Sequence, residues 1–357
     1  MVFETIGSLG HEQVVFCHNK DVGLKAIIAV HNTTLGPALG GLRMWPYKSE
    51  QEALNDVLRL SRGMTFKAAV AGLNLGGGKS VIIGDNKTTN REMIFRAHGR
   101  FVDSLGGRYV TAEDVGTNVE DMDFVHMETK FVTGIGSKSG DPSSVTAHGV
   151  FRAIEASALE KWGSASLKGR TVAIQGLGHV GNFLSNELHA AGAKLVVTDI
   201  DAARIQRVVD ATGATVVPLK DIYGVKADIF APCALGGIIN DETIPQLQVE
   251  IVAGAANNQL LEDRHGDALE ARGILYAPDY VANAGGVINV YSELTGWSRE
   301  RALRKADEIY ATVLSVFKLA KDTRIPTYKA ADRVAQQRIQ AVRGMIKTWP
   351  QYPNREG

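Results

Sequence analysis

One short glycine pattern constrains the fold of this chain more than any other feature. Residues 175–181 read QGLGHVG, which matches the spacing G-x-G-x-x-G, after a β-branched run and before a helical pattern that extends to Ala191. In such a strand–turn–helix unit, the first glycine permits a tight turn and the second lets a pyrophosphate approach the backbone. The third allows the helix to pack closely on the strand. The pattern predicts a dinucleotide-binding turn made of Gly176, Leu177, Gly178, His179, Val180 and Gly181.

The acidic residue after the next predicted strand indicates which dinucleotide binds. The run Lys194–Thr198 is followed by Asp199, close to the position where a ribose-binding acid is expected. A carboxylate there accepts hydrogen bonds from the ribose 2′-hydroxyl and repels a 2′-phosphate, so NAD is favoured over NADP. The alternative is a purely structural glycine turn, with Asp199 capping the strand.

Strands and helices alternate through the second half of the chain, which predicts a parallel, doubly wound sheet. The expected strands are Thr171–Gln175, Lys194–Thr198, Ile229–Pro232, Ile251–Gly254 and Ile274–Ala277. The expected helices there are Ala147–Trp162, a helix from the glycine turn to Ala191, Arg204–Asp210, Ser298–Lys321 and Ala330–Lys347.

The first third is also mixed α/β. Its expected strands are Gln13–His18 and Leu24–Asn32, joined as a hairpin, Lys79–Gly84 and Arg108–Ala112. Its expected helices begin at Ser49, span Asn90–Leu105, and run from a Thr117 cap to about Glu128.

The length of 357 residues suits about two domains. The segment Thr133–Thr146 is rich in glycine, serine and Asp-Pro and predicts a linker. We therefore expect an N-terminal α/β substrate and oligomerisation domain over residues 1–134, and a Rossmann-type NAD-binding domain over 146–324. The C-terminal helix, from about 325 to 357, is expected to return to the first domain.

Composition excludes several classes of protein. Lysine plus arginine and aspartate plus glutamate each number 39, so the formal net charge is zero and nucleic acid is an unexpected partner. The two cysteines, Cys17 and Cys233, are too few for a disulfide framework and suit a reducing compartment. No apolar run is long enough to span a membrane and the start resembles no signal peptide, so we expect a cytoplasmic protein. Neither H-E-x-x-H nor G-x-S-x-G occurs, which argues against metal and serine hydrolysis and predicts no metal site.

A second glycine cluster, Gly76-Gly77-Gly78-Lys79, places a lysine beside backbone and apolar residues. It fails the spacing of a triphosphate-binding loop, because Leu73 stands where the first glycine belongs. Three glycines leave no side chain between Lys79 and a bound molecule, and lost solvation lowers the pKa of an amine. Lys79 is therefore a candidate base, with Asp114 as a proton carrier and Lys67 as a cation for a carboxylate. The alternative for each lysine is a solvated surface charge.

Six segments make the chain resemble the Glu/Leu/Phe/Val dehydrogenase family, and within it the leucine-using members. They are Leu35–Met44 (LGPALGGLRM), Leu73–Asp85 (LNLGGGKSVIIGD), Thr111–Gly116 (TAEDVG), Asp228–Leu235 (DIFAPCAL), Ala255–Leu260 (AANNQL) and Ala277–Val290 (APDYVANAGGVINV). The resemblance implies a substrate domain facing a Rossmann-type domain, and reversible oxidative deamination of an L-amino acid to a 2-oxo acid, ammonia and NADH. It also implies a homo-oligomer, commonly an octamer.

The resemblance assigns roles to individual residues. Lys67 would bind the substrate α-carboxylate, Lys79 would activate the attacking water, and Asp114 would shuttle protons as the iminium collapses through a carbinolamine. Thr146, Asn258 and Asn283 would line the nicotinamide–substrate region, and Ala231 and Cys233 would contact the cofactor. For each asparagine, a turn or cap role is the alternative.

The resemblance also places the residues that select the substrate side chain, namely Leu39, Gly40, Met64, Ala112, Thr133, Val287 and Val290. An apolar wall cannot compensate the desolvation of a second carboxylate, which argues against glutamate. One or two methylene groups decide little in such a pocket, so leucine, valine and isoleucine should all be accepted. An aromatic amino-acid dehydrogenase remains the alternative within the family. A catalytically silent NAD-binding sensor is the alternative outside enzymes.

Overall fold

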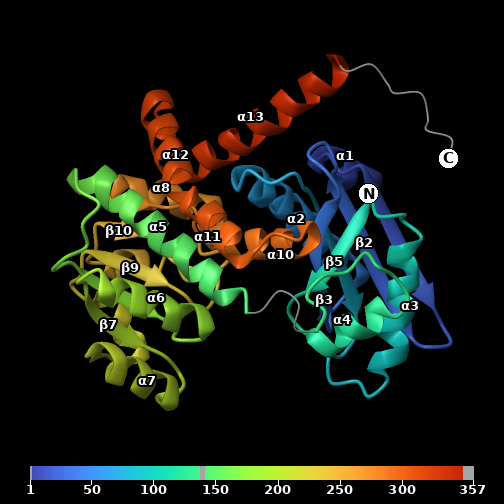
Figure 1. The fold of residues 1–357 in the computed structure, drawn as a ribbon, viewed down its shortest axis with the longest axis horizontal. Helices are drawn as coiled ribbons and strands as arrows, with labels where there is room; N and C mark the ends of the chain where they lie inside the picture. The colour runs from blue at the N-terminus through green and yellow to red at the C-terminus, as the bar shows by residue number, and fades with distance from the viewer. Residues whose placement is uncertain (1, 137–140, 349–357) are drawn as a thin grey trace. The chain divides into compact units, whose positions relative to one another are not determined.

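The computed structural model describes residues 2–136 and 141–348 (Figure 1). Residues 137–140 of the predicted linker lie outside the described residues. The chain divides into two units: Met1–Lys138 with Ala335–Gly357, and Ser139–Val334. No helix in the described part of the chain is long and apolar enough to cross a membrane.

The first unit is a mixed sheet with helices on both faces. Its elements are α1 (Val2–Leu9), β1 (Gln13–Asn19), β2 (Leu24–Asn32), β3 (Ala38–Trp45), α2 (Glu50–Val70), β4 (Gly76–Ile83), α3 (Arg91–Asp103), β5 (Tyr109–Glu113), α4 (Val119–His126) and the end of α13 (Thr327–Thr348). The strand order is β1-β2-β4-β3-β5. Strands β4, β3 and β5 are parallel, β2 is antiparallel to β4, and β1 is antiparallel to β2. The carboxyl ends of β3 and β5 therefore lie at the same edge.

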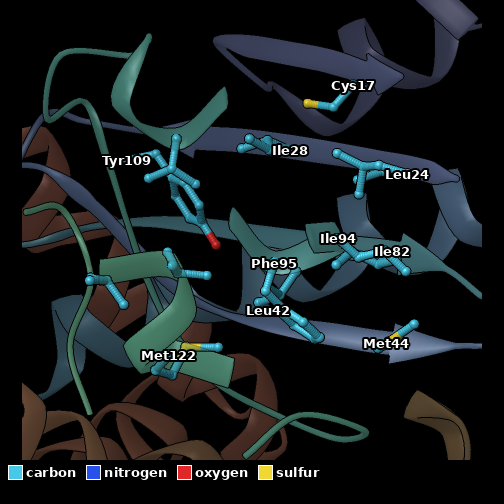
Figure 2. Packing of buried hydrophobic residues seen from close by; sticks show 14 of the residues in the cluster. Cys17, Leu24, Ile28, Leu42, Met44, Ile82, Ile94, Phe95, Tyr109 and Met122 are labelled. Atoms are coloured by element: carbon cyan, nitrogen blue, oxygen red, sulfur yellow. The ribbon is translucent and has the colours of Figure 1, made fainter. Parts of the chain in front are cut away.

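Two apolar clusters fix the helices on this sheet. One face packs on α3 and α4 through a cluster that includes Leu42, Phe95 and Met122, with the Tyr109 ring beside them (Figure 2). The other face packs on α2 through Leu54, Val57 and Leu58. The end of α13 also belongs to this unit, where Arg338 donates hydrogen bonds to the Leu73 carbonyl and the Asn74 side chain.

The second unit is a six-stranded parallel sheet. Its strands are β6 (Thr171–Gln175), β7 (Lys194–Thr198), β8 (Thr215–Val216), β9 (Ile229–Pro232), β10 (Ile251–Val252) and β11 (Leu275–Tyr276). Its α-helices are α5 (Ser143–Trp162), α6 (His179–Ala190), α7 (Ala202–Thr212), α8 (Asp263–Ala271), α9 (Asp279–Ala282), α10 (Gly285–Thr295), α11 (Arg299–Asp307), α12 (Ile309–Thr323) and the start of α13. Two short 3-10 helices are η1 (Leu219–Gly224) and η2 (Ile244–Gln246). The strand order is β11-β10-β9-β6-β7-β8. Numbered along the chain, this is the 3-2-1-4-5-6 order of a Rossmann sheet, whose switch point lies between β6 and β9. The predicted doubly wound fold is confirmed.

The structure corrects several predicted elements. Strand β3 was not expected, because two adjacent glycines and Arg43 weaken its β-pattern, yet it is the strand between β4 and β5. Helix α4 is capped by Asn118 instead of Thr117, whose hydroxyl bonds to Leu42 and Asp114 instead.

The predicted helices also differ from the observed ones. The predicted helix over 298–321 is two helices that meet at Glu308, which keeps helical dihedral angles. Helix α5 begins at Ser143, inside the predicted linker. Helices α1, α8, α9 (Asp279–Ala282) and α10 were not predicted.

A buried histidine in α3 gives the first unit a pH-dependent stability. His98 is fully buried, and neither ring nitrogen has a hydrogen-bond partner among the described residues. Burial lowers the pKa of its imidazole to about 4, whereas in the unfolded chain it titrates near the ordinary value of 6.5. Between these values the unfolded state binds the extra proton, so the free energy of unfolding falls as the pH falls.

Replacing His98 by methionine should therefore remove an acid-induced loss on the order of 3 kcal/mol between pH 7 and pH 4. Urea unfolding across that range measures the effect, with exposed His18→Gln as the control. Equal loss of stability in His98→Met and the unmodified protein would contradict it.

Candidate active site

A buried amine and a carboxylate meet in the first unit. Lys79 lies within β4 and is only 5% exposed, and its Nζ is 3.0 Å from Oδ2 of Asp114, which directly follows β5. The two predicted catalytic side chains therefore form an ion pair, although 34 residues separate them along the chain. Most buried lysines need such a partner, because an isolated ammonium loses its hydration.

The backbone brings Asp114 over the sheet edge because β3 has a glycine there. A Cβ on Gly41 would lie 2.8 Å from the Cβ of Asp114 and 2.6 Å from the carbonyl oxygen of Glu113. The hydroxyl of Thr117 then holds the turn, since it accepts from the Asp114 amide at 2.9 Å and lies 3.0 Å from the Leu42 carbonyl. Asp114 is thus placed by the main chain of β3 and by the turn after β5.

Burial and the neighbouring charges shift the pKa values of Lys79 and Asp114. Desolvation is the largest effect on Lys79 and lowers the pKa of the amine; Asp114 raises it in part, and nearby Arg43 lowers it again. Desolvation alone would raise the pKa of the Asp114 carboxyl, but Lys79 and Arg43 outweigh burial and hold that pKa below its ordinary value. An amine that gives up its proton more readily than a solvated lysine, beside an ionised carboxylate, is suited to accept and pass on protons.

The glycines before Lys79 serve packing, which differs from the role predicted for them. A Cβ on Gly77 would lie 2.1 Å from the amide of Thr65 in α2, and one on Gly78 would lie 2.6 Å from the Tyr109 ring. The space that they leave is filled by the protein's own atoms. They let α2 sit directly on β4, which explains how Lys79 comes to be enclosed.

The remaining candidates of the first unit lie on α2, β3 and β5 and in the segment after α4. Lys67 is half-buried in the last turn of α2, and Met64 lies one turn earlier. Gly40 pairs with Thr111 of β5, next to the pairing of Gly41 with Ala112. The other two candidates are buried: Leu39 at 2% exposure, and Thr133, whose amide donates to the Thr111 carbonyl at 2.9 Å. The Thr133 hydroxyl has no hydrogen-bond partner among the described residues.

The glycine turn of the second unit follows β6 at the switch point of the sheet. Gly176 adopts φ 96°, a left-handed conformation that favours glycine. A Cβ on Gly181 would lie 2.0 Å from the Gly176 carbonyl oxygen, whereas one on Gly178 would meet nothing closer than Arg204 Nη1 at 4.0 Å. The third glycine thus packs α6 onto the turn, while the second leaves open space at the N-terminus of α6.

The other turn residues differ in exposure. Leu177 is buried, Val180 is half-buried, and the exposed His179 contacts Asp141 with Nδ1 and Oδ2 3.0 Å apart. Two further candidates, Ala231 and Cys233, lie at the carboxyl end of β9, the neighbour of β6. The Cys233 amide donates to the Gln175 carbonyl at 2.7 Å, which holds the chain after β9 beside the turn.

Asp199, which directly follows β7, contacts the glycine turn. Its Oδ2 accepts a hydrogen bond from the Leu177 amide at 2.6 Å, and its Oδ1 accepts one from the Asp201 amide at 2.9 Å. The carboxylate is therefore held against the glycine turn by two backbone donors. Each oxygen retains a further acceptor position.

Asn283 presents a buried acceptor without a partner. The residue is 2% exposed, and its Nδ2 donates to the Ala255 carbonyl and to Asn257 Oδ1 at 3.0 and 2.9 Å. Its Oδ1 has no hydrogen-bond partner among the described residues. An orphaned buried oxygen of this kind calls for a donor such as a ligand amide.

The remaining predicted residues of the second unit lie near the start of α10 and in the loop after β10. Thr146 of α5 lies against that start, since a Cβ on Gly286 would be 3.2 Å from the Thr146 hydroxyl. Val287 is buried and Val290 half-buried on α10. Asn258 is exposed and adopts a left-handed φ of 51°, which is uncommon for a residue other than glycine.

Two family models match the chain along most of its length. The model described as Glu/Leu/Phe/Val dehydrogenase, dimerisation domain, matches residues 11–131. The model described as Glutamate/Leucine/Phenylalanine/Valine dehydrogenase matches residues 136–213 and 200–344. The chain belongs to the Glu/Leu/Phe/Val dehydrogenase family.

Members of the Glu/Leu/Phe/Val dehydrogenase family are similar to this chain in sequence and in structure. The chain is 58% identical to leucine dehydrogenase of Geobacillus stearothermophilus, over 96% of this chain and 94% of that protein. It is 56% identical to leucine dehydrogenase of Bacillus cereus, over 98% and 96%. The crystal structure of L-tryptophan dehydrogenase from Nostoc punctiforme superposes with a TM-score of 0.88 at 49% identity, covering 96% of this chain and 99% of that one.

The sequence did not reveal the polar residues that surround the Lys79–Asp114 pair. Arg43 Nε donates to Asp114 Oδ2 at 3.0 Å and its Nη1 donates to Asp56 Oδ2 at 2.9 Å, while the Tyr47 hydroxyl donates to that same Asp56 oxygen at 2.7 Å. The available signal was the Gly40-Gly41-Leu42-Arg43 run, in which an arginine follows two glycines inside a buried strand. An arginine on a buried strand needs a carboxylate partner, but the sequence does not say which one.

Proposed function

We propose that this chain catalyses the NAD-dependent, reversible oxidative deamination of branched-chain L-amino acids to 2-oxo acids and ammonia. Leucine is the main expected substrate, with valine and isoleucine also accepted. The observation that carries the proposal is the buried Lys79–Asp114 pair, with its two charged atoms 3.0 Å apart, in a chain 58% identical to a leucine dehydrogenase. A silent relative has no need of an enclosed amine held at the cost of its hydration.

The proposed mechanism uses three side chains of the first unit. Lys67 pairs with the substrate carboxylate and fixes its orientation. Neutral Lys79 removes a proton from a water molecule as that water attacks the imine carbon of the oxidised substrate. Asp114 then passes protons to and from the nitrogen as ammonia leaves. Lys79 can serve because burial lowers the pKa of its amine, and Asp114 because its carboxyl stays ionised.

NAD is the proposed cofactor, and the residues of the second unit fit it. Gly178 leaves space at a helix N-terminus where a pyrophosphate can approach, Asp199 offers acceptors for a ribose, and the orphaned Asn283 oxygen can accept from a carboxamide. NAD supplies a hydride acceptor for the substrate Cα when it is bound. Thr146, Asn258, His179, Ala231 and Cys233 are proposed to complete its contacts.

Side-chain selection is proposed to rest on an apolar lining. Leu39 and Val287 are buried aliphatic residues, and an aliphatic side chain offers a carboxylate no compensating charge. Met64, Ala112, Thr133 and Val290 complete the proposed lining with Gly40. An aromatic amino acid is the second candidate, because the superposed Nostoc punctiforme enzyme is named an L-tryptophan dehydrogenase.

Initial rates of NADH production with leucine, valine, isoleucine, phenylalanine, tryptophan and glutamate test the proposal. We expect kcat/KM to be highest for the branched-chain substrates and lowest for glutamate. A preference for phenylalanine or tryptophan would refute the substrate, while NADH binding without turnover of any amino acid would indicate a sensor.

Asp199 should determine the choice between NAD and NADP. In Asp199→Ala we expect the ratio of kcat/KM for NAD to that for NADP to fall about tenfold or more, since a like charge facing a 2′-phosphate costs several kcal/mol. Arg204, close to the glycine turn, would then be a cation available to the extra phosphate. Steady-state kinetics with both cofactors measure the ratio, with exposed Asp210→Asn as the control. An unchanged ratio would leave Asp199 a purely structural residue.

Assembly and compartment are part of the proposal. We expect a homo-oligomer, an octamer by resemblance, and the model that matches residues 11–131 is described as a dimerisation domain. Cys17 and Cys233 are both free thiols, which supports a reducing, cytoplasmic environment.

A further inference from the structure

Arg43 is a charged residue at the candidate site that the proposed mechanism does not use. It lies on β3 with its side chain 20% exposed, and its guanidinium bridges two carboxylates from different parts of the chain. Nε reaches Asp114 Oδ2 at 3.0 Å and Nη1 reaches Asp56 Oδ2 at 2.9 Å. A planar, permanently charged fork can hold two acceptors at once, which a lysine cannot.

The far end of this bridge is itself anchored. Asp56 lies on α2 and accepts from the Tyr47 hydroxyl at 2.7 Å on Oδ2, and from Arg59 Nη2 at 3.0 Å on Oδ1. The guanidinium is therefore held between α2 and the turn after β5. A guanidinium fixed at both ends sets where the Asp114 carboxylate lies and how far it can rotate.

Lys79 and Arg43 both contact the same oxygen of the Asp114 carboxylate. Lys79 Nζ and Arg43 Nε both lie 3.0 Å from Oδ2. No hydrogen bond reaches Oδ1 from the described residues. Oδ2 thus accepts from two cations, while the lone pairs of Oδ1 can accept from a further donor.

We propose that Arg43, held by Asp56, is a positioning residue that anchors Asp114 through Oδ2 and leaves Oδ1 to exchange protons with the substrate. The same cation disfavours a second positive charge on Lys79. Arg43 thereby favours the ionised form of the carboxylate and the neutral form of the amine. This inference rests on the proposed dehydrogenase function.

The charges that face the pair set the direction of the expected pH effect. They are Arg43 and Tyr47 at β3, Asp56 and Arg59 on α2, and Tyr109 and Glu113 on β5. Of these, Arg43 is the cation that lowers the pKa of both Lys79 and Asp114. Loss of its charge therefore raises both pKa values. The acid limb of the deamination profile, where Lys79 gives up its proton, then moves to higher pH.

The test compares Arg43→Gln, Arg43→Lys and the unmodified enzyme in pH profiles of kcat and KM for leucine oxidation with NAD. For Arg43→Gln we expect the acid limb to rise on the order of one pH unit. We expect kcat to fall about 10- to 100-fold with a small change in KM, since a misplaced proton carrier slows chemistry more than binding. Arg43→Lys should keep the limb close to its original pH but not recover kcat, because it restores charge without the fork.

A cavity beside Arg43 allows chemical rescue. It has a volume of about 470 Å³ and is lined by Arg43, Trp45, Tyr47, Glu52, Asn55, Asp56, Arg59 and Val115. In Arg43→Ala, added methylguanidinium should enter this space, raise kcat and return the acid limb toward its original pH, whereas methylammonium should not raise kcat. Rescue of both quantities distinguishes positioning from a general loss of folding.

A matched control removes a different ion-paired arginine of the same unit. Arg96 pairs with Glu92 and Glu128, whereas Lys79 pairs with Asp114. Arg96→Gln should lower thermal stability at most and leave the pH profile unchanged. An unmodified profile and kcat in Arg43→Gln, or absence of rescue in Arg43→Ala, would overturn the role of Arg43. Absence of turnover in the unmodified enzyme would instead refute the proposed function.

Discussion

Replacing Lys79 by alanine should reduce kcat for leucine oxidation about 10³-fold or more, while NADH still binds with nearly its original affinity. The amine is the proposed base, and removal of a positioned base typically costs 10²- to 10⁴-fold. NADH binding should persist because the glycine turn belongs to the other unit. Steady-state rates and fluorescence titration with NADH measure the two quantities.

A second variant separates loss of the base from loss of the ion pair. Lys79→Arg keeps a cation beside Asp114, but a guanidinium does not give up its proton in proteins. We therefore expect it to be as inactive as Lys79→Ala while retaining more of the stability of the enzyme. Exposed Lys48→Ala is the control for removal of a lysine. Turnover within tenfold of the original in Lys79→Ala would refute the role given to the amine.

Replacing Asp114 by asparagine should lower kcat 10²- to 10⁴-fold, because an amide of the same shape cannot take up and release a proton at neutral pH. The fold should survive, since the Asp114 main chain is held by Thr117. Asp114 raises the pKa of Lys79. Its neutralisation should therefore shift the acid limb of the residual activity to lower pH, opposite to the shift expected for Arg43→Gln.

Kinetics across pH measure both effects of Asp114→Asn. Glu50→Gln removes an exposed carboxylate at the start of α2 and serves as the control. If Asp114→Asn retained more than a tenth of the original kcat, Asp114 would hold Lys79 in place without carrying protons. A limb shifted to higher pH would contradict the charge argument for the pair.

The second unit was predictable because its signals are local. Strand, glycine turn and helix follow one another between Thr171 and Ala190, and Asp199 comes from the next strand of the same sheet. Parallel strands connected by helices have few permitted arrangements, so their sequence order indicates which carboxyl ends meet. The family resemblance also indicated Lys67, Lys79 and Asp114.

The first unit was less predictable because its key contacts join distant residues. Strand β3 carries two glycines that a pattern of alternating residues does not recognise, and Gly41 matters only because Asp114 crosses over it. Gly77 and Gly78 were interpreted as space for a ligand, whereas α2 and Tyr109 fill that space. Their function depends on a neighbour that the local sequence does not name.

The order of residues was enough to predict the class of fold, the glycine turn that we propose for the cofactor, and the amine and carboxylate that we propose for proton transfer, since each lies in a short segment that spacing or the family resemblance marks. Only the tertiary structure showed that Arg43 holds Asp114 through Oδ2. Arg43, Asp56 and Asp114 come from a strand, a helix and a turn. Contacts between side chains far apart in the chain are set by how strands and helices pack, and the spacing of residues along the sequence does not predict them.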